Sequence, residues 1–158
     1  HPAAMSIPAG LNQLAGSWQG MQRLWLMPTD PVRESHSEMV ISPTANGNFL
    51  LLRYTWAEDG QVQEGLLVAG SAENSSRVRA VWVDSWHMQH EMMICEGEEK
   101  PGGGFSVRGA YPPPYESDWG WRITITLQEP DTFLLTMHNI PPDGQELLAV
   151  ETIYLRQP

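Results

Sequence analysis

Hydrophobic and polar residues alternate along most of this chain in short runs, and the alternation has the period of a β-strand. In residues 120–127, for example, Trp121, Ile123 and Ile125 alternate with polar or charged side chains. Side chains two positions apart share one face of a strand, so such a run has one apolar face. Runs of this kind, rich in Val, Ile, Leu, Trp, Tyr and Thr, predict about ten strands. Their approximate ranges are 17–27, 34–42, 48–57, 62–69, 77–84, 87–95, 104–111, 120–127, 132–139 and 147–156.

Glycine and proline separate these runs. The 14 glycines and 13 prolines recur too often for several long helices. Four connections carry Gly, Asn or Asp where a tight hairpin needs unusual backbone angles. They are Ala45-Asn46-Gly47, Glu58-Asp59-Gly60, Glu129-Pro130-Asp131 and Pro142-Asp143-Gly144. Sequential hairpins imply a meander, and only residues 7–15 are predicted to form a short helix, with coil as the alternative.

A meander of this length has two unpaired edges unless the sheet closes on itself. We therefore predict an all-β fold, a single antiparallel up-and-down β-barrel of about ten strands with a short N-terminal helix. A two-sheet sandwich with Greek-key connections is the alternative. The interior of a barrel of this size holds either packed side chains or one small ligand, so the size of the cavity becomes the functional question.

The length and charge of the chain narrow the possible functions. Its 158 residues fit one domain, here 11–158 behind an N-terminal tail of residues 1–10. Either Met5 is the natural start, with an expression remnant before it, or the chain begins at a processed terminus. The net charge of -10 argues against nucleic acid and anionic membranes as partners. No apolar run approaches the roughly 20 residues that a membrane span needs.

The cysteine content bears on the cellular compartment that we expect for the protein. Cys95 is the single cysteine, so there is no intramolecular disulfide and no CxxC pair for a structural zinc. We find no signal peptide and expect a cytoplasmic protein.

Both ends of the predicted barrel resemble a known pattern. The first strand contains Gly16-Ser17-Trp18, and the last ends in Tyr154-Leu155-Arg156. This pairing resembles the lipocalins and fatty-acid-binding proteins. The resemblance implies that Arg156 packs over the indole of Trp18 in a cation–π contact that closes one end of the barrel.

A larger set of segments is similar to a bacterial lipocalin-like family of unassigned function in the calycin superfamily. The resemblance covers about residues 11–156 and implies a calycin-type barrel, but no particular activity. The segments that carry it are Tyr54-Thr55-Trp56 with Asp59-Gly60, then Gln63 to Leu67, Trp82 to Met88, Trp119 to Arg122, and Glu151 to Arg156.

The N-terminal half also resembles the nitrobindin-like haem barrels. It shares Gly-x-Trp-x-Gly, a Phe-Leu strand that ends in Thr-Trp, and a Glu-Gly-Leu hairpin. The haem ligand of that group is a histidine in a late strand. Here the last strand, 147–156, has no histidine, and His138 lies one strand earlier. We therefore expect neither haem nor another cofactor.

Candidate catalytic residues come from 77–88 and its neighbours. If 77–88 is one continuous strand, Trp82, Asp84 and Trp86 share a face with Met88, and His87 lies on the other. Burial would then raise the pKa of the Asp84 carboxyl and suit it to act as a general acid or base. If a turn falls at Asp84-Ser85 instead, the tryptophans are packing residues.

Other polar residues allow two interpretations each. His87, His90 and Glu91 have the spacing of a zinc site on a helix, but on a strand the two histidines point apart, so we expect no metal site. Arg122 either is solvated outside the barrel or binds a ligand carboxylate inside it. Glu64 would be its charge partner, or a base, if it faces the interior. Asp84, His87 and Glu64 are the catalytic candidates.

The seven tryptophans are more than core packing needs, so some are expected to line a pocket. We predict a protein that binds a small, partly hydrophobic molecule in the barrel cavity. An enzyme using the acid–base candidates is one alternative, and a homodimer formed through exposed tryptophans and the proline-rich loop 111–115 is another. The predicted ligand-binding residues are Trp56, Trp82, Trp86, Met88, Trp121, Arg122 and His138.

Overall fold

A computed structural model describes residues 9–72, 74–112 and 118–158. Residues 7 and 8 of the predicted helix lie outside this part of the chain, and so does most of the proline-rich loop 111–115 proposed as a dimer contact.

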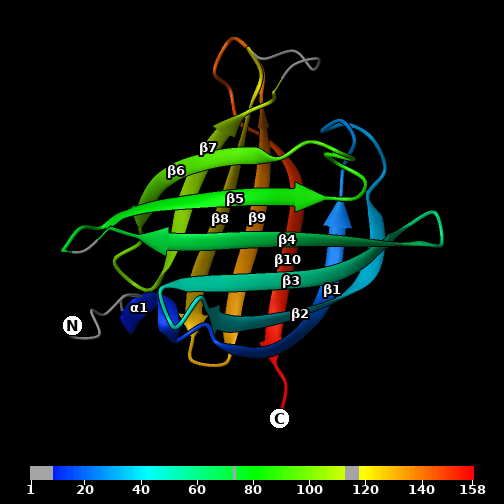
Figure 1. Ribbon diagram of the computed structural model, residues 1–158. Coiled ribbons are helices and arrows are strands. Elements are labelled where there is room, and N and C mark those ends of the chain that lie inside the picture. The colour runs from blue at the N-terminus through cyan, green and yellow to red at the C-terminus, as the bar shows by residue number, and fades with distance from the viewer. Residues whose placement is uncertain (1–8, 73, 113–117) are drawn as a thin grey trace.

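Ten antiparallel strands close into one barrel, as predicted (Figure 1). Each strand pairs with its neighbours in sequence, and the first pairs with the last, so Trp18 lies opposite Arg156. The elements are α1 (Ala9–Asn12), β1 (Gly16–Leu24), β2 (Arg33–Thr44), β3 (Phe49–Glu58), β4 (Gln61–Ser71), β5 (Arg77–Asp84), β6 (Met93–Glu99), β7 (Gly104–Ala110), β8 (Gly120–Glu129), β9 (Thr132–Ile140) and β10 (Leu147–Arg156).

The largest departure from the predicted strands is β6. It begins at Met93, not at residue 87, because the chain turns directly after Asp84. The Asp84 Oδ1 atom accepts the backbone N–H groups of Trp86 and His87, both at 2.8 Å. A side chain that bonds to amides two and three residues ahead favours a turn over a strand. The assignment of 77–88 to two faces of one strand is therefore wrong beyond Asp84, and the alternative of a turn is confirmed.

The hairpin between β3 and β4 shows how local sequence sets the register. Asp59 and Gly60 have φ angles of 51° and 76°, as a two-residue type I′ turn requires. Glu58 therefore pairs directly with Gln61. This register directs alternate residues of β3 inward, among them Leu52, Tyr54 and Glu58.

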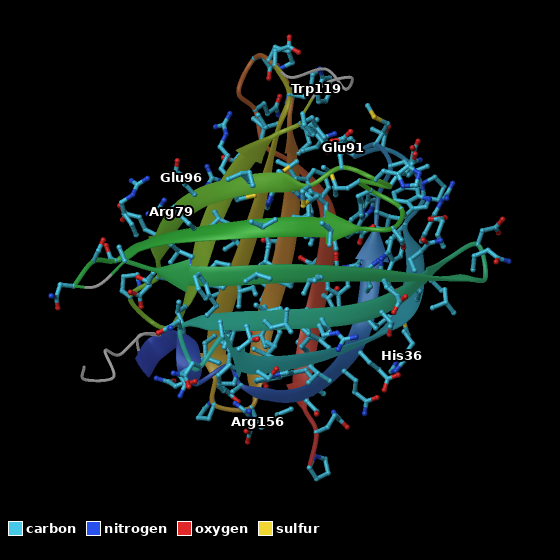
Figure 2. All side chains as sticks on the ribbon, viewed as in Figure 1. His36, Arg79, Glu91, Glu96, Trp119 and Arg156 are labelled. Carbon is cyan, nitrogen blue, oxygen red and sulfur yellow. The ribbon has the colours of Figure 1, made fainter. Side chains whose placement is uncertain are left out.

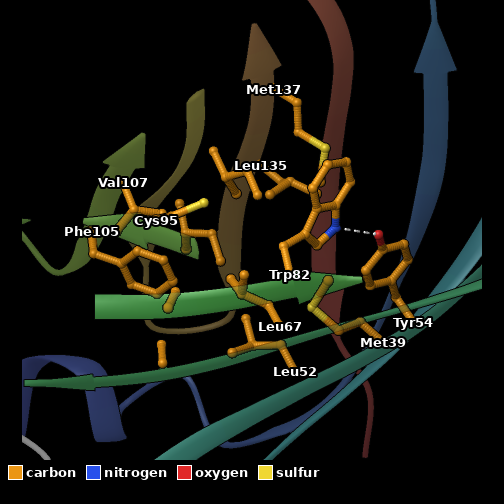
Figure 3. Packing of buried hydrophobic residues seen from close by; sticks show 14 of the residues in the cluster. Met39, Leu52, Tyr54, Leu67, Trp82, Cys95, Phe105, Val107, Leu135 and Met137 are labelled. Carbon is orange, nitrogen blue, oxygen red and sulfur yellow. Dashed lines mark hydrogen bonds between the residues drawn. The ribbon is translucent and has the colours of Figure 1, made fainter. Parts of the chain in front are cut away.

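Side chains fill the interior of the barrel (Figure 3). A hollow between these core side chains measures about 10 Å³, which is room for one water molecule. It is lined by Met39, Leu52, Tyr54, Leu67, Trp82, Ile123, Ile125, Leu135 and Met137. This hollow is far smaller than the ligand-sized central cavity that we expected, because large side chains from facing strands meet across the barrel.

One end of the barrel, called here the α1 end, is closed by buried leucines and by the hydrogen bonds of Trp18 and Arg156. Leu11 and Leu14 are buried there, and Leu14 accepts the indole N–H of Trp18 at 2.9 Å. The guanidinium of Arg156 lies 4.3 Å from the centre of the Trp18 ring. It also donates to the carbonyl oxygens of residues 13, 15 and 130 and to the carboxylate of Asp131. Figure 2 labels Arg156 at this end.

Candidate functional site

The opposite, distal end of the barrel carries an aromatic cluster. At this end β3 stops at Glu58, β5 stops at Asp84 and β8 begins at Gly120. The cluster consists of the His87 imidazole and four indole rings around it, at centroid distances of 4.8 to 5.6 Å. The indoles belong to Trp56, Trp82, Trp86 and Trp121. Four strands or loops thus bring together all four tryptophans predicted to bind a ligand.

The rings pack in two geometries. Trp82 and Trp121 stack with centroids 5.5 Å apart and planes 8° from parallel. Trp56 and Trp86 meet edge to face at 5.6 Å. Trp82 is fully buried and Trp86 is half-buried, so the cluster reaches from the core to the surface. A ligand that entered from outside would meet Trp86 first.

Asp84 holds the aromatic cluster together. Besides the two backbone amides bonded to Oδ1, its Oδ2 atom accepts the hydroxyl of Tyr54 at 2.7 Å and the indole N–H of Trp56 at 3.2 Å. Tyr54 in turn accepts the indole N–H of Trp82 at 2.9 Å (Figure 3). Four donors occupy the carboxylate, which leaves it poorly placed to exchange a proton with a substrate. The geometry favours a structural role for Asp84.

Gly65 makes room for this network. It lies opposite Tyr54 in the β3–β4 register. A Cβ atom at this position would lie 2.0 Å from the Cζ atom of Tyr54. Only glycine therefore allows the phenol ring to reach Asp84.

Burial shifts two pKa values in this region. It raises the pKa of Tyr54 well above the ordinary value, and the negative charge of Asp84 adds to the shift. It lowers the pKa of His87, although the negative charges of Asp84 and Glu58 oppose that effect. His87 therefore stays neutral at neutral pH.

Residues 85–92, called here the plug segment, close the distal end. Met88 is fully buried, and the amides of Met88 and Gln89 both donate to the carbonyl oxygen of Asp84 at 3.0 Å. Ser85 bonds to β4, because its N–H donates to the Glu64 carbonyl and its hydroxyl accepts the Glu64 N–H. His87 and Met88 thus occupy the space that a ligand inside this end would need.

Glu58 is a candidate that the sequence interpretation missed. Its side chain is 9% exposed and forms an ion pair through Oε1 with Arg33, whose side chain is 51% exposed. The Oε2 atom has no hydrogen-bond partner in the described part of the chain. A buried acceptor without a donor costs about 1–3 kcal/mol. The alternation of β3 offered a signal, because position 58 continues its inward face.

Glu58 and Trp86 line a depression of about 930 Å³ on the surface of the distal end. The other lining residues are Arg33, Glu34, Ser35, His36, Ala57, Asp59 and Gly60. The volume of this distal depression is within the usual range of small-molecule sites.

Three further buried polar atoms near this end lack partners among the described residues: Trp121 Nε1, His138 Nδ1 and Asn139 Oδ1. Trp121 and Asn139 face each other in the β8–β9 register. Within the described residues, the Trp121 Nε1 donor has no acceptor and the Asn139 Oδ1 acceptor has no donor. Native proteins leave few buried polar atoms unsatisfied, so such pairs mark places where a ligand or water is expected to bind.

Three predicted site residues lie elsewhere. Arg122 is on the outer wall, because the apolar face of β8 turns inward, and it donates to both carboxylate oxygens of Glu146 at 2.9 and 3.1 Å. His138 is opposite Arg122 on β9, half-buried. Glu64 is exposed on β4 and is not inside the barrel opposite Arg122. None of the three contributes to the aromatic cluster.

Among the described residues, no three His, Cys, Asp or Glu side chains lie close enough to hold a metal ion. In the same ranges, no helix has the length and hydrophobicity to cross a membrane.

Solved structures with the same fold have little sequence in common with this chain. Rv2717c from M. tuberculosis superposes with a TM-score of 0.73 at 14% identity, over 97% of this chain and 100% of its own. The S-type phycobiliprotein lyase CPES from Guillardia theta gives 0.65 at 13% identity, over 98% and 94%. A redesigned β-barrel gives 0.51 at 15% identity, over 98% and 100%. These likenesses show the fold alone.

Sequence comparisons identify the family. Comparison with curated proteins gives no match. The sequence profile of the family described as "Protein of unknown function (DUF1579)" matches residues 7–156. That match spans nearly the whole barrel, and the chain therefore belongs to the DUF1579 family.

Proposed function

We propose that this protein binds a small, partly apolar molecule at the distal end of the barrel. The observation that carries the proposal is the meeting, at one end, of four tryptophans with buried atoms of Glu58, Trp121 and Asn139 that have no partner within the described residues. Apolar walls with a few polar groups are typical of ligand sites. One of the similar barrels is a phycobiliprotein lyase, which supports a small-molecule role for this architecture.

The ligand takes the place of the plug side chains. The central cavity of about 10 Å³ is too small for any organic ligand. A ligand that reaches Trp82 and Trp121 must therefore displace His87 and Met88 from the distal end. Trp86, which is half-buried at the edge of the distal depression, then covers the bound molecule.

Binding without chemistry is the better-supported role. The Asp84 carboxylate is occupied by four donors, and Glu64 is exposed on the outer wall. Of the catalytic candidates, His87 is enclosed by four indole rings, a setting that suits packing and ligand contact. We assign the aromatic cluster to ligand recognition, with Met88 as a displaced residue.

A fluorescence titration tests this proposal. Fatty acids, haem, bilins and aryl amines, alcohols and carboxylates are titrated into the protein, and tryptophan emission and thermal stability are followed. We expect saturable quenching by at least one class, weakened about tenfold in Trp86→Leu because a large aromatic contact is lost. Trp25→Leu, which removes a tryptophan outside the aromatic cluster, serves as the control. The absence of saturable quenching for every class, or equal effects of the two variants, would refute the proposal.

A further inference from the structure

Resting on the proposed binding site, we infer that its ligand carries a positively charged amine, which binds between the Glu58 carboxylate and the indole of Trp86. The chemistry is that of an aryl or alkyl ammonium ion. Glu58 supplies the charge partner, and Trp86 and Trp56 supply aromatic faces.

The first argument is the unused half of the Glu58 carboxylate. The side chain is more than nine-tenths buried and lines the distal depression, yet its Oε2 atom has no donor among the described residues. A buried carboxylate oxygen needs a hydrogen-bond donor, and a charged donor stabilises it more than a neutral one. An ammonium N–H group meets this need, whereas a carboxylate or ether ligand does not.

Arg33 already shows that Glu58 accepts a cation. Its guanidinium pairs with Oε1, although the Arg33 side chain remains about half exposed to solvent. An ion pair with one partner so exposed is weak, so a ligand can displace it at small cost. Arg33 thus competes with the ligand ammonium for the negative charge of the Glu58 carboxylate.

The aromatic neighbours suit a cation as well. Trp86 lines the same depression as Glu58, and Trp56 meets Trp86 at 5.6 Å. Indole faces attract ammonium groups, and tryptophan is the strongest of the aromatic side chains in this respect. An aromatic wall beside a buried carboxylate is selective for a positive group that carries an apolar body.

The surrounding charges favour the same ligand. Glu34, Glu58 and Asp59 line the distal depression, against Arg33 and His36 as the basic residues. Asp84, which accepts the indole N–H of Trp56, adds a negative charge next to the aromatic cluster. His87 adds no positive charge at neutral pH, because burial lowers its pKa. The whole chain carries a net charge of -10. This field attracts cations to the distal end and repels anions.

Isothermal titration calorimetry with three matched probes tests the inference. The probes are phenethylamine, 2-phenylethanol and 3-phenylpropanoate at pH 7.5, a cation, a neutral molecule and an anion of similar shape. We expect phenethylamine to bind about tenfold or more tightly than the other two, with an affinity that falls as salt is added.

Two variants with opposite effects make the assignment specific. Glu58→Gln is expected to weaken phenethylamine binding about tenfold, and Arg33→Gln to strengthen it by about threefold because the competing cation is gone. Glu98→Gln makes the same charge change on an exposed position of β6, outside the site, and is expected to change affinity less than about twofold. Near-ultraviolet circular dichroism checks that each variant keeps the aromatic packing.

The outcomes separate the two claims. Equal binding of the three probes, or unchanged phenethylamine affinity in Glu58→Gln with intact aromatic packing, overturns the inference and leaves the binding function standing. If Glu58→Gln loses the aromatic packing, a decrease in affinity in Arg33→Gln overturns the inference instead. No saturable binding of any probe here, together with no quenching in the broader titration, overturns both.

Discussion

Replacing Asp84 by asparagine is the sharpest test of the network that shapes the distal end. The carboxylate accepts two backbone amides on Oδ1 and two side-chain donors on Oδ2. Asparagine has nearly the same shape but only one acceptor oxygen, and its amide nitrogen is a donor. Two of the four donors must then face a nitrogen that cannot accept them.

The expected cost follows from that count. A hydrogen bond to a charged group contributes about 1.5–3 kcal/mol, so losing two predicts that Asp84→Asn lowers the free energy of unfolding by about 3–6 kcal/mol. Domains of this size have total stabilities of about 5–15 kcal/mol, so the loss is large but measurable. The released plug segment should also reduce the near-ultraviolet circular dichroism of the tryptophans.

Urea unfolding of four proteins measures this effect and its origin. They are the parent, Asp84→Asn, Tyr54→Phe and the double variant. Because Tyr54 donates directly to Asp84, the two substitutions should be coupled by at least about 1 kcal/mol. Asp143→Asn is the matched control, since Asp143 accepts one backbone N–H in an exposed turn, and it should cost less than about 0.5 kcal/mol. A loss below about 1 kcal/mol for Asp84→Asn, or additive single effects, would show that this network does not hold the plug segment.

Two other predictions concern the same end. The lowered pKa of His87 means that the unfolded chain binds a proton more readily than the folded one, so stability should fall as pH decreases through about 6.5. In His87→Phe, denaturant unfolding at pH 7.5 and 5.5 should show a smaller decrease, and an identical decrease in both proteins would contradict this assignment. Gly65→Ala should lower stability by about 1–3 kcal/mol, because the new methyl group collides with the Tyr54 ring. Gly102→Ala adds a methyl group in open space, so its melting temperature in thermal denaturation should be close to that of the parent. Equal melting temperatures for the two variants would argue against the collision.

The fold was readable from the sequence because its signals are local. The alternation in residues 120–127 correctly predicted which face of β8 is apolar, and Asp59-Gly60 predicted a tight hairpin. Closure of the sheet followed from the need to pair both edges. The start of β6 was misplaced because hydrophobic residues such as Trp86 fit a strand and a buried turn equally well. The side-chain bonds of Asp84 decide between them, and periodicity does not report such bonds.

The candidate site was predicted only in part, because its contacts join residues that lie far apart in the sequence. The excess of tryptophans led us to expect some of them in a pocket, and the four named for it lie together because one end of a barrel gathers the ends of several strands. Whether Glu58 has a free oxygen depends on Arg33, which is 25 positions away. The filled interior depends on how all the inward side chains fit together, which no local pattern contains.

The difference between the two ends of the barrel supports the proposed position of the binding site. At the α1 end, the guanidinium of Arg156 donates hydrogen bonds to three backbone carbonyl groups and covers the Trp18 ring. The polar groups of that contact therefore have partners. At the distal end, buried atoms of Glu58, Trp121 and Asn139 have no partner in the part of the chain that the structure describes. Stability alone favours removing such atoms, since apolar residues of similar size would pack there without the cost of an unmet hydrogen bond. Their presence beside a wall of tryptophans is therefore better explained by a molecule that binds there than by the needs of the barrel itself.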